Sequence, residues 1–379
     1  EFSLPLRRVN GVLGTALTAE EAKHILSRFQ LDVTVQNDVL TVLVPVRRLD
    51  IKAEQDLIEE IGRVYGYNQL PITLPSTNTE GGLTAYQRKR RQIKRHLEGL
   101  GLFEAITYSL THPDKEKGFT EAKGTHVLRP LSEDHQSLRQ TLVPSLLDVL
   151  KYHHARQMES VHVFEMGHLY LTEETETLAL ALMGPWHEAP WKAARPLDFF
   201  VLKGVITHVL ELFGVSATFK PSMLPAMHPH QTAELMVDGN VVGFCGAVHP
   251  KTLNNYDLKE AFVAEISIGK LKAYLDEENR YVPVSKMPSV KRDIAFIVDQ
   301  ALPAESLVEA AFNAHVDYLY DVEIFDVYTG KPLLESEKSL ALRLYFNDKT
   351  GTFKTADIDH LMDQLTAHLT QTLNIRVRT

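Results

Sequence analysis

The last 95 residues of the chain contain an order of secondary-structure elements that few folds can accommodate. Segments with alternating apolar residues and segments with apolar residues three and four apart follow one another there. They predict strands at 290–298, 319–327, 340–346 and 375–378, and helices at 304–315 and from about 355. The order β-α-β-β-α-β is that of the ferredoxin-like sandwich. We therefore predict a ferredoxin-like domain over residues 284–379.

The first 75 residues predict a smaller α+β domain. Thr18 and Glu21 have the spacing of a capping box at the start of a helix. Two short strands around 33–35 and 40–44 follow, and a second helix contains residues 56–65. Helix, hairpin and helix are compatible with a winged-helix type of arrangement. The Pro-rich segment 70–78 predicts a linker after this domain.

The residues between these two parts, 76–283, predict a larger α+β domain with mostly antiparallel strands. Strands are expected at 103–110, 161–171, 178–183 and 261–268, and helices at 86–97 and 198–213. The pair Asp238-Gly239 between two alternating runs predicts a hairpin. A chain of 379 residues is long enough for two or three domains. The fold class that we predict for the whole chain is α+β.

Composition narrows the function classes. The net charge of −9 argues against a general nucleic-acid binder, although a local basic patch remains possible. No apolar run approaches the roughly 18 residues of a membrane span, and the start does not resemble a signal peptide. The single cysteine, Cys245, excludes an internal disulfide, fits a reducing cytosol and is interpreted as core filler. We expect a cytoplasmic protein without membrane contact, and the missing initial Met suggests a piece of a longer one.

Motifs that would indicate a reaction centre are missing. Neither a phosphate-binding glycine loop nor a Gly-x-Ser-x-Gly turn occurs. His228 and His230, like His153 and His154, lack the cysteine partners or H-E-x-x-H spacing of a zinc site, so we interpret them as loop or surface histidines. The loop 186–191, with a Trp at each end, is expected to pack over a domain edge rather than to form a binding lid. We predict no catalytic residue.

Two charged helices leave alternatives open. The basic helix at 86–97 is either a solvated face or a contact for RNA or an acidic partner. On the helix that contains residues 56–65, Asp56, Glu59, Glu60 and Arg63 lie on one side, and Asp50 precedes Asp56 by six residues. Such carboxylates suit a hard divalent cation, but acidic residues early in a helix also complement its dipole. Spacing alone does not decide between the two. The opposite face carries the apolar residues Leu57, Ile58, Ile61, Val64 and Tyr65.

The stretch from Asp50 to Tyr67 resembles the beta subunit family of bacterial phenylalanine–tRNA ligase, and the resemblance continues over essentially the whole chain. Residues 129–139, 163–167, 198–204 and 246–250 are similar to its central domain. Residues 288–296 and 325–330 are similar to its ferredoxin-fold anticodon-binding domain. Several independent motifs in the family's order make the resemblance specific.

The resemblance implies a hetero-tetramer of two alpha and two beta subunits whose aminoacylation site, with ATP as co-substrate, lies on alpha. The central domain would be a class II synthetase-like domain that has lost catalysis and serves assembly. The carboxylates of Asp50, Asp56, Glu59 and Glu60 match those that bind Mg²⁺ shared with alpha, some of them through water. Leu49 replaces the family's usual aromatic residue. No part resembles the family's oligonucleotide-binding fold or editing domain, so we expect the C-terminal half.

The presumed anticodon-binding domain is acidic, because residues 285–379 contain ten Lys or Arg and fourteen Asp or Glu, a net charge of −4. Contact with tRNA(Phe) would therefore depend on a local patch and on base stacking by aromatics such as Phe296 or Tyr345, although alternation along a strand makes half of these aromatics core residues instead. The patch that we predict consists of Lys286, Lys291, Arg292, Arg376 and Arg378.

Two other functions fit parts of the sequence. The first is a free-standing RNA-binding or scaffold protein with the same folds and no ligase partner. The second is a metal-dependent hydrolase centred on Asp56, which is weak because no nucleophile or general base accompanies that residue.

Overall fold

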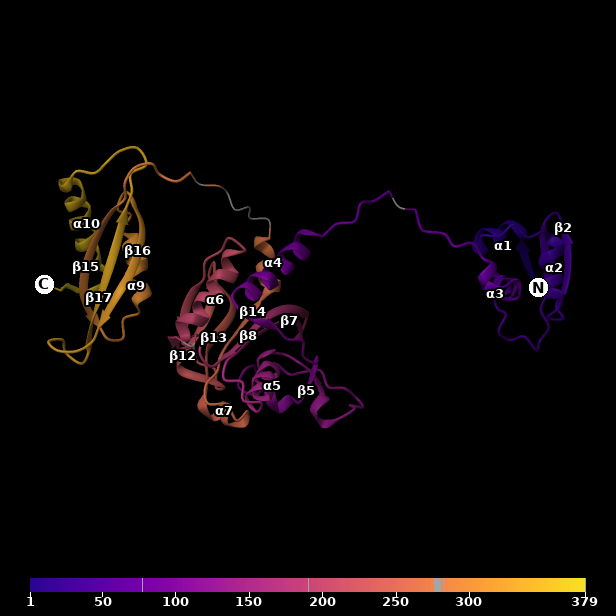
Figure 1. Cartoon of the computed structure of the whole chain (residues 1–379), viewed down its shortest axis with the longest axis horizontal. Helices are drawn as coiled ribbons and strands as arrows, with labels where there is room; N and C mark the ends of the chain where they lie inside the picture. Colours follow the sequence, from indigo (N-terminus) through magenta and orange to yellow (C-terminus); the bar gives the residue numbers. More distant parts are fainter. Residues whose placement is uncertain (77, 190, 276–280, 282, 379) are drawn as a thin grey trace. The chain divides into compact units, whose positions relative to one another are not determined.

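The computed structural model describes residues 1–379 except 77, 190, 276–280, 282 and 379. Helices and sheets are both present, and the predicted α+β class is confirmed. The chain separates into two compact units, Glu1–Arg88 and Lys89–Thr379, which we describe one at a time (Figure 1). The boundaries of our three-domain division stay a prediction.

The first unit contains a three-stranded antiparallel sheet in the order β1-β3-β2 and three longer helices. Its elements are β1 (Phe2–Pro5), α1 (Leu6–Leu13), α2 (Ala19–Ser27), β2 (Asp32–Gln36), β3 (Val39–Leu43) and α3 (Glu54–Tyr65). The capping box at Thr18 is confirmed, since its side chain accepts from Glu21 N and Thr18 N donates 2.7 Å to Glu21 Oε2. Strand β1 and helix α1 were not predicted from the sequence.

The apolar face of α3 holds this unit together. Leu57, Ile58 and Ile61 are buried among residues of α2, β1 and β3. The carboxylates of the same helix therefore lie on its outer side, as the helical spacing predicts.

A seven-stranded sheet forms the centre of the second unit, in the order β11-β12-β13-β14-β8-β7-β4. Its pairs are antiparallel except β4 with β7, which is parallel. The strands are β4 (Phe103–Glu104), β7 (Val161–Tyr170), β8 (Glu174–Met183), β11 (Thr218–Pro221), β12 (Met227–Val237), β13 (Asn240–Val248) and β14 (Phe262–Ser267). Cys245 is fully buried in β13, as core filler should be.

Helices cover the sheet. Helix α5 (Val143–His154) packs on β7 and β8, whereas α6 (Phe199–Glu211) packs on β13 and β14. Two further helices are α4 (Ala85–Gly99) and α7 (Pro250–Asn255). The predicted strand at 103–110 is wrong, because only Phe103–Glu104 pairs with β7 and the next strand, β5 (Leu110–Thr111), pairs with β6 (Ser137–Leu138).

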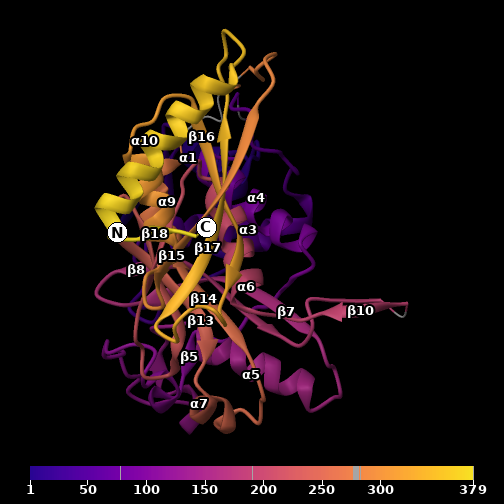
Figure 2. The same cartoon turned by 90° about the vertical axis from the view of Figure 1, so that its left-hand side faces the viewer.

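The C-terminal part has the predicted order of elements. These are β15 (Val290–Asp299), α9 (Ala304–Asn313), β16 (Leu319–Tyr328), β17 (Glu337–Phe346), α10 (Thr355–Leu373) and β18 (Arg376–Val377). The four strands form an antiparallel sheet in the order β16-β17-β15-β18, and both helices pack on one of its faces (Figures 1 and 2). The ferredoxin-like fold is confirmed. Within the residues that the structure describes, no helix has the length and apolar character needed to cross a membrane.

Candidate nucleic-acid interface

Helices α9 and α10 lie on one face of the C-terminal sheet; no helix among the described residues covers the other, which we call the open sheet face. Phe296 and Leu344 point toward α9 and α10 and are fully buried. Side chains alternate along a strand, so the residues between them point the other way. Strand register then places Lys291 beside Tyr345 and Asp293 beside Arg343 on the open sheet face.

Three cations of the open sheet face lie over aromatic rings. Lys291 Nζ is 5.3 Å from the centre of the Tyr345 ring. The guanidinium carbons of Arg343 and Arg378 are 4.6 Å and 4.9 Å from the ring centres of Phe325 and Tyr328, respectively. Such pairs hold flat cationic and aromatic groups together at the surface, where they can stack on nucleic-acid bases.

Acidic residues on the same face offset part of this charge. Arg343 forms two hydrogen bonds with Asp293, of 2.9 Å and 2.8 Å, and Arg376 Nη2 lies 2.8 Å from Glu337 Oε1. The Arg343 guanidinium keeps the pKa of Asp293 below its usual range. The Tyr345 hydroxyl donates 2.7 Å to Glu323 Oε2, and this bond raises the pKa of Tyr345. The open sheet face thus offers aromatic surface more than net positive charge.

The predicted basic patch is only partly assembled. Lys291 and Arg378 are exposed and lie over aromatic rings, and Lys286 is exposed just before β15. Arg376 is exposed but paired with Glu337. Arg292 is half-buried, faces the same side as Leu344 and donates to Lys291 O, so it lies off the open sheet face.

The two aromatic residues that we expected to stack on bases lie on opposite faces of the C-terminal sheet. Phe296 has no exposed surface and belongs to the core, so its expected stacking role is wrong. Tyr345 lies on the open sheet face. Arg343, Phe325 and Tyr328 were not among the residues predicted to contact RNA. Alternation along β17 places Arg343 on the same side of the strand as Tyr345. In β16, which contains Phe325 and Tyr328, a bulge between Ile324 and Asp326 shifts the register, so simple alternation does not hold there.

The four carboxylates predicted to bind metal have separate roles in the first unit. Asp56 Oδ2 accepts hydrogen bonds from Lys52 N and Ala53 N at 2.7 Å and 2.8 Å, so it caps the start of α3. Glu59 is exposed. Asp50 and Glu60 converge on one cation, since Arg48 Nη2 lies 2.6 Å from a carboxylate oxygen of each.

These contacts shift the acidity of the converging pair. The Arg48 hydrogen bond lowers the pKa of Asp50. Burial raises the pKa of Glu60, but hydrogen bonds from Arg63 and Arg48 outweigh it and lower the pKa overall. Asp50 and Glu60 are thus close enough for one positive charge to contact both. Among the residues that the structure describes, no group of three or more His, Cys, Asp or Glu side chains is arranged to hold a metal ion.

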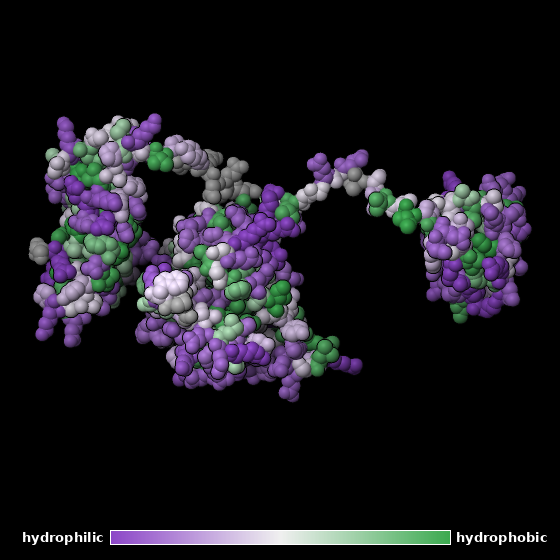
Figure 3. Space-filling model, in the orientation of Figure 1, coloured by the Kyte–Doolittle hydropathy of each residue, from purple (hydrophilic) through white to green (hydrophobic). Residues whose placement is uncertain are grey.

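The basic helix α4 uses several of its cations within the fold. Arg90 Nε lies 2.7 Å from Glu176 Oε1, Lys94 pairs with Glu104, and Lys89 donates to Leu212 O. Arg91 and Arg95 are exposed, and Figure 3 shows a strongly hydrophilic run at the position of this helix. Arg88 donates 2.6 Å to Leu83 O, so four of the six Lys and Arg side chains of α4 have partners within the chain.

The two tryptophans, Trp186 and Trp191, differ in how far they are exposed. Trp186 packs against His162 with ring centres 4.9 Å apart, as expected for packing over a domain edge. Trp191 has 86% of its surface exposed and follows residue 190, which lies outside the described residues. His228 and His230, predicted to be loop or surface histidines, both lie in β12; His230 is exposed, His228 is half-buried, and their ring centres are 6.1 Å apart.

Comparison with protein-family models places synthetase domains along the chain. Residues 2–67 match the tRNA synthetase B5 domain, residues 70–268 the phenylalanyl tRNA synthetase beta chain CLM domain, and residues 285–378 the ferredoxin-fold anticodon binding domain. An α+β chain with these three matches is a chain of the aminoacyl-tRNA synthetase class.

Relatives identify the family. The phenylalanine–tRNA ligase beta subunits of Geobacillus kaustophilus and Bacillus subtilis are 42% and 40% identical over 96% and 93% of this chain. Those alignments cover 47% and 45% of the relatives, so the chain spans about half of their length. A solved pyrrolysyl tRNA synthetase from Desulfitobacterium hafniense is 15% identical, with a TM-score of 0.41 over 58% of this chain and 75% of that chain. The chain belongs to the phenylalanyl tRNA synthetase beta chain family.

Proposed function

We propose that this chain acts as part of a phenylalanine–tRNA ligase beta subunit. It assembles with alpha subunits, two of each, and supports ATP-dependent attachment of phenylalanine to tRNA(Phe) in the cytoplasm. Its three domains follow the boundaries 1–75, 76–283 and 284–379, and the reaction itself takes place on alpha. The observation that carries the proposal is the open sheet face, where cations lie over aromatic rings within the stretch that matches an anticodon-binding domain.

The open sheet face suits the single-stranded anticodon loop. Unpaired bases stack on aromatic side chains, and each such contact is worth about 1–3 kcal/mol. Tyr345, Phe325 and Tyr328 offer rings, while Lys291 and Arg378 lie beside them to contact phosphates. Stacking accounts for binding by a domain whose net charge is negative.

The Mg²⁺ site is a further part of the proposal. Asp50 and Glu60 already share one cation, Arg48, and a metal ion carries the charge needed to replace it. Asp56 and Glu59 complete the set of four, and alpha supplies the remaining contacts. Mg²⁺ keeps several waters and uses few carboxylates directly, so it does not require a complete protein cage on this chain.

Binding of tRNA(Phe) tests the role of the open sheet face. In the double variant Lys291→Gln/Arg378→Gln, loss of two charges should weaken binding and lower the slope of log affinity against log salt by about 1.4, or 0.7 per charge. Lys354→Gln is the matched control, because Lys354 is exposed at the start of α10 on the helix side. Unchanged affinity of the double variant at several salt concentrations would reject this interface.

Co-expression with a phenylalanine–tRNA ligase alpha subunit tests assembly. A stable complex that elutes together in size exclusion is the expected result. If the chain binds tRNA but forms no complex with alpha, the free-standing RNA-binding protein is the correct interpretation. The family matches along the whole chain favour the ligase subunit over this rival.

A further inference from the structure

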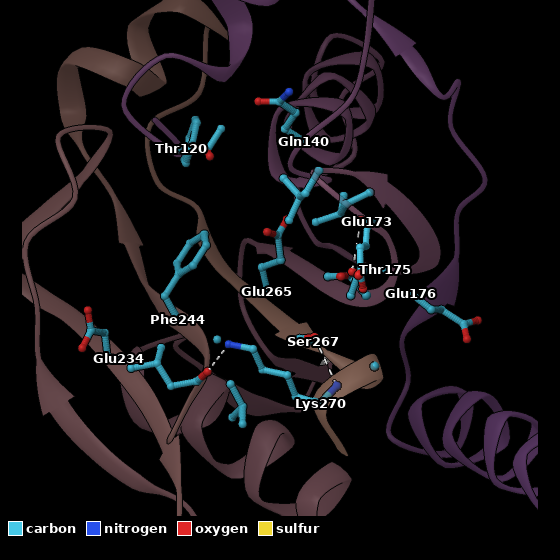
Figure 4. A pocket seen from close by; sticks show the side chains of 18 of the residues that line it. Thr120, Gln140, Glu173, Thr175, Glu176, Glu234, Phe244, Glu265, Ser267 and Lys270 are labelled. Carbon is cyan, nitrogen blue, oxygen red and sulfur yellow. Dashed lines mark hydrogen bonds between the residues drawn. The ribbon is translucent and has the colours of Figure 1, made fainter. Parts of the chain in front are cut away.

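A pocket of about 600 Å³ lies on the central sheet of the second unit. Strands β8, β12, β13 and β14 supply its floor, and Figure 4 shows the side chains that line it. Register places Glu265 of β14 directly beside Phe244 of β13, and Phe244 beside Glu234 of β12. Two carboxyl groups therefore flank one aromatic ring on the same face of the sheet. This pocket is separate from the open sheet face and from the carboxylates of α3.

Gln140 lines the same pocket with an unused amide. Its side chain has 3% of its surface exposed, yet neither Nε2 nor Oε1 has a hydrogen-bond partner among the described residues. Figure 4 places Gln140 with Thr120 at one end of the pocket, beyond Glu265. A buried amide without partners is unfavourable, and a bound group that offers both a donor and an acceptor would remove this cost.

Glu265 is held in place by its neighbours. Thr141 Oγ1 and Leu142 N both donate to its Oε2, each at 2.7 Å. Because both donors bond the same oxygen, the carboxyl group keeps a fixed orientation and Oε1 remains to accept from a ligand. Glu234 accepts from Ser222 at 3.2 Å at the other side of Phe244.

The charge of the lining favours a cation. Five glutamates line the pocket (Glu173, Glu174, Glu176, Glu234 and Glu265), against two lysines (Lys270 and Lys272), and one of the five, Glu176, is paired with Arg90. Lys270 Nζ donates 2.5 Å to Val241 O, so this lysine is already engaged by the backbone. A pocket lined by an excess of one sign of charge attracts ligands of the other sign and repels phosphates.

We propose that this pocket binds a small organic cation that also carries a carbonyl or amide group. Its cationic group contacts Glu265 beside the ring of Phe244, which adds a cation–π interaction, and Glu234 on the other side of that ring adds electrostatic attraction. Its amide group takes the unused donor and acceptor of Gln140. A guanidinium suits the carboxylates well, because its fork of N–H groups can bond two oxygens at once. This inference does not depend on the proposed ligase function.

Calorimetric titration of the whole chain at pH 8 tests the proposal with Nα-acetyl-L-argininamide, a permanent cation with two amide groups. Its uncharged isostere, Nα-acetyl-L-citrullinamide, has the same shape and is the matched ligand. We expect the cation to bind with a Kd of about 1 mM or tighter, and the isostere to bind at least about tenfold more weakly.

Variants locate the site. Gln140→Leu should weaken binding of the cation about tenfold, since it removes both amide hydrogen bonds. Glu234→Gln, at a half-buried position on the pocket floor, should weaken it several-fold and keeps the test valid if Gln140→Leu does not fold. Glu260→Gln, exposed and outside this pocket, is the control and should leave binding unchanged. Circular dichroism verifies that each variant is folded.

Three results would overturn the proposal. The first is no heat of binding for the cation at about ten times the expected Kd. The second is equal affinity for the cation and its uncharged isostere, which would show that the carboxylates do not select charge. The third is wild-type affinity in folded Glu234→Gln, which would place the ligand elsewhere.

Discussion

The buried pair Arg139–Glu165 should be a principal determinant of the stability of the central sheet. Arg139 and Glu165 have only 4% and 3% of their surface exposed, and Arg139 Nη1 lies 2.7 Å from Glu165 Oε1. The same guanidinium donates to Thr107 Oγ1 and to His168 O, each at 3.0 Å. Arg139→Met removes all of these bonds and leaves the carboxylate buried without its cation. Breaking such a pair from one side costs about 3–5 kcal/mol.

Urea unfolding of the whole chain can measure this loss. The chain has two tryptophans, Trp186 and Trp191, and Trp186 packs against His162 of β7, so intrinsic fluorescence reports on the central sheet. Arg139→Met should lower the free energy of unfolding by about 3–5 kcal/mol. The double variant Arg139→Met/Glu165→Leu should recover a large part of this loss, because neither partner then leaves a charge behind.

Controls separate the buried pair from a general loss of positive charge. Arg95→Met removes an exposed arginine from α4 and should change stability by less than about 0.5 kcal/mol. Gly167→Ala should also destabilise the sheet, because a Cβ atom there would lie 2.3 Å from Arg139 Nη2. A loss below about 1 kcal/mol in Arg139→Met would refute the reasoning, as would a double variant that is less stable than the single one.

Three further predictions concern other regions. Burial raises the pKa of Glu265 to about 7, so the contribution of Glu265 to stability is fully present below pH 4.5 and is lost as the pH rises through 7. Glu265→Gln should therefore flatten the decline in unfolding free energy between pH 5 and 8. An unchanged pH profile in this variant would contradict the prediction. Phe296→Ala should cost about 3–5 kcal/mol of stability because it leaves a cavity in the core. Tyr345→Leu should leave thermal stability unchanged and weaken tRNA(Phe) binding. A stable Phe296→Ala variant with weakened tRNA(Phe) binding, or a destabilised Tyr345→Leu variant with normal binding, would contradict these assignments. Arg48→Met should remove the cation that Asp50 and Glu60 share, while Glu60 keeps its pair with Arg63. Added Mg²⁺ should therefore raise the melting temperature of this variant more than that of the wild type, and equal shifts would contradict the convergence of the two carboxylates.

The C-terminal fold could be predicted because its signals are periodic and local. Helix α10 repeats apolar residues over five turns, and Ile358, Leu361 and Leu365 are buried as that spacing requires. Strand β1 could not be found in the same way, since four residues are too few to show alternation and α1 follows Pro5 directly. Residues 105–109 have strand-like composition but lie beyond the two residues that pair with β7, and only the tertiary partner decides this.

Only some members of the predicted basic patch lie on the open sheet face, for a similar reason. A basic patch can be listed from composition, but its members are sorted by register, which put Lys291 on the open side and Arg292 on the side of Leu344. A shift of the strand register by one residue would exchange the sides on which Lys291 and Arg292 lie. Arg343 escaped the analysis because its partners, Asp293 and Phe325, lie on neighbouring strands and are distant in sequence.

The acidic residues of α3 show why one sequence pattern can serve three physical roles. A carboxylate in the first turn can cap the helix, pair with an arginine or bind a metal, and Asp56 caps while Asp50 and Glu60 pair with Arg48. Arg48 lies twelve residues before Glu60, so helical spacing does not reveal their contact. A divalent ion that uses both carboxylates must first displace this guanidinium, which weakens metal binding by the chain alone. Metal affinity should therefore rise when a partner provides further oxygen ligands or another site for Arg48, and this would couple Mg²⁺ binding to assembly.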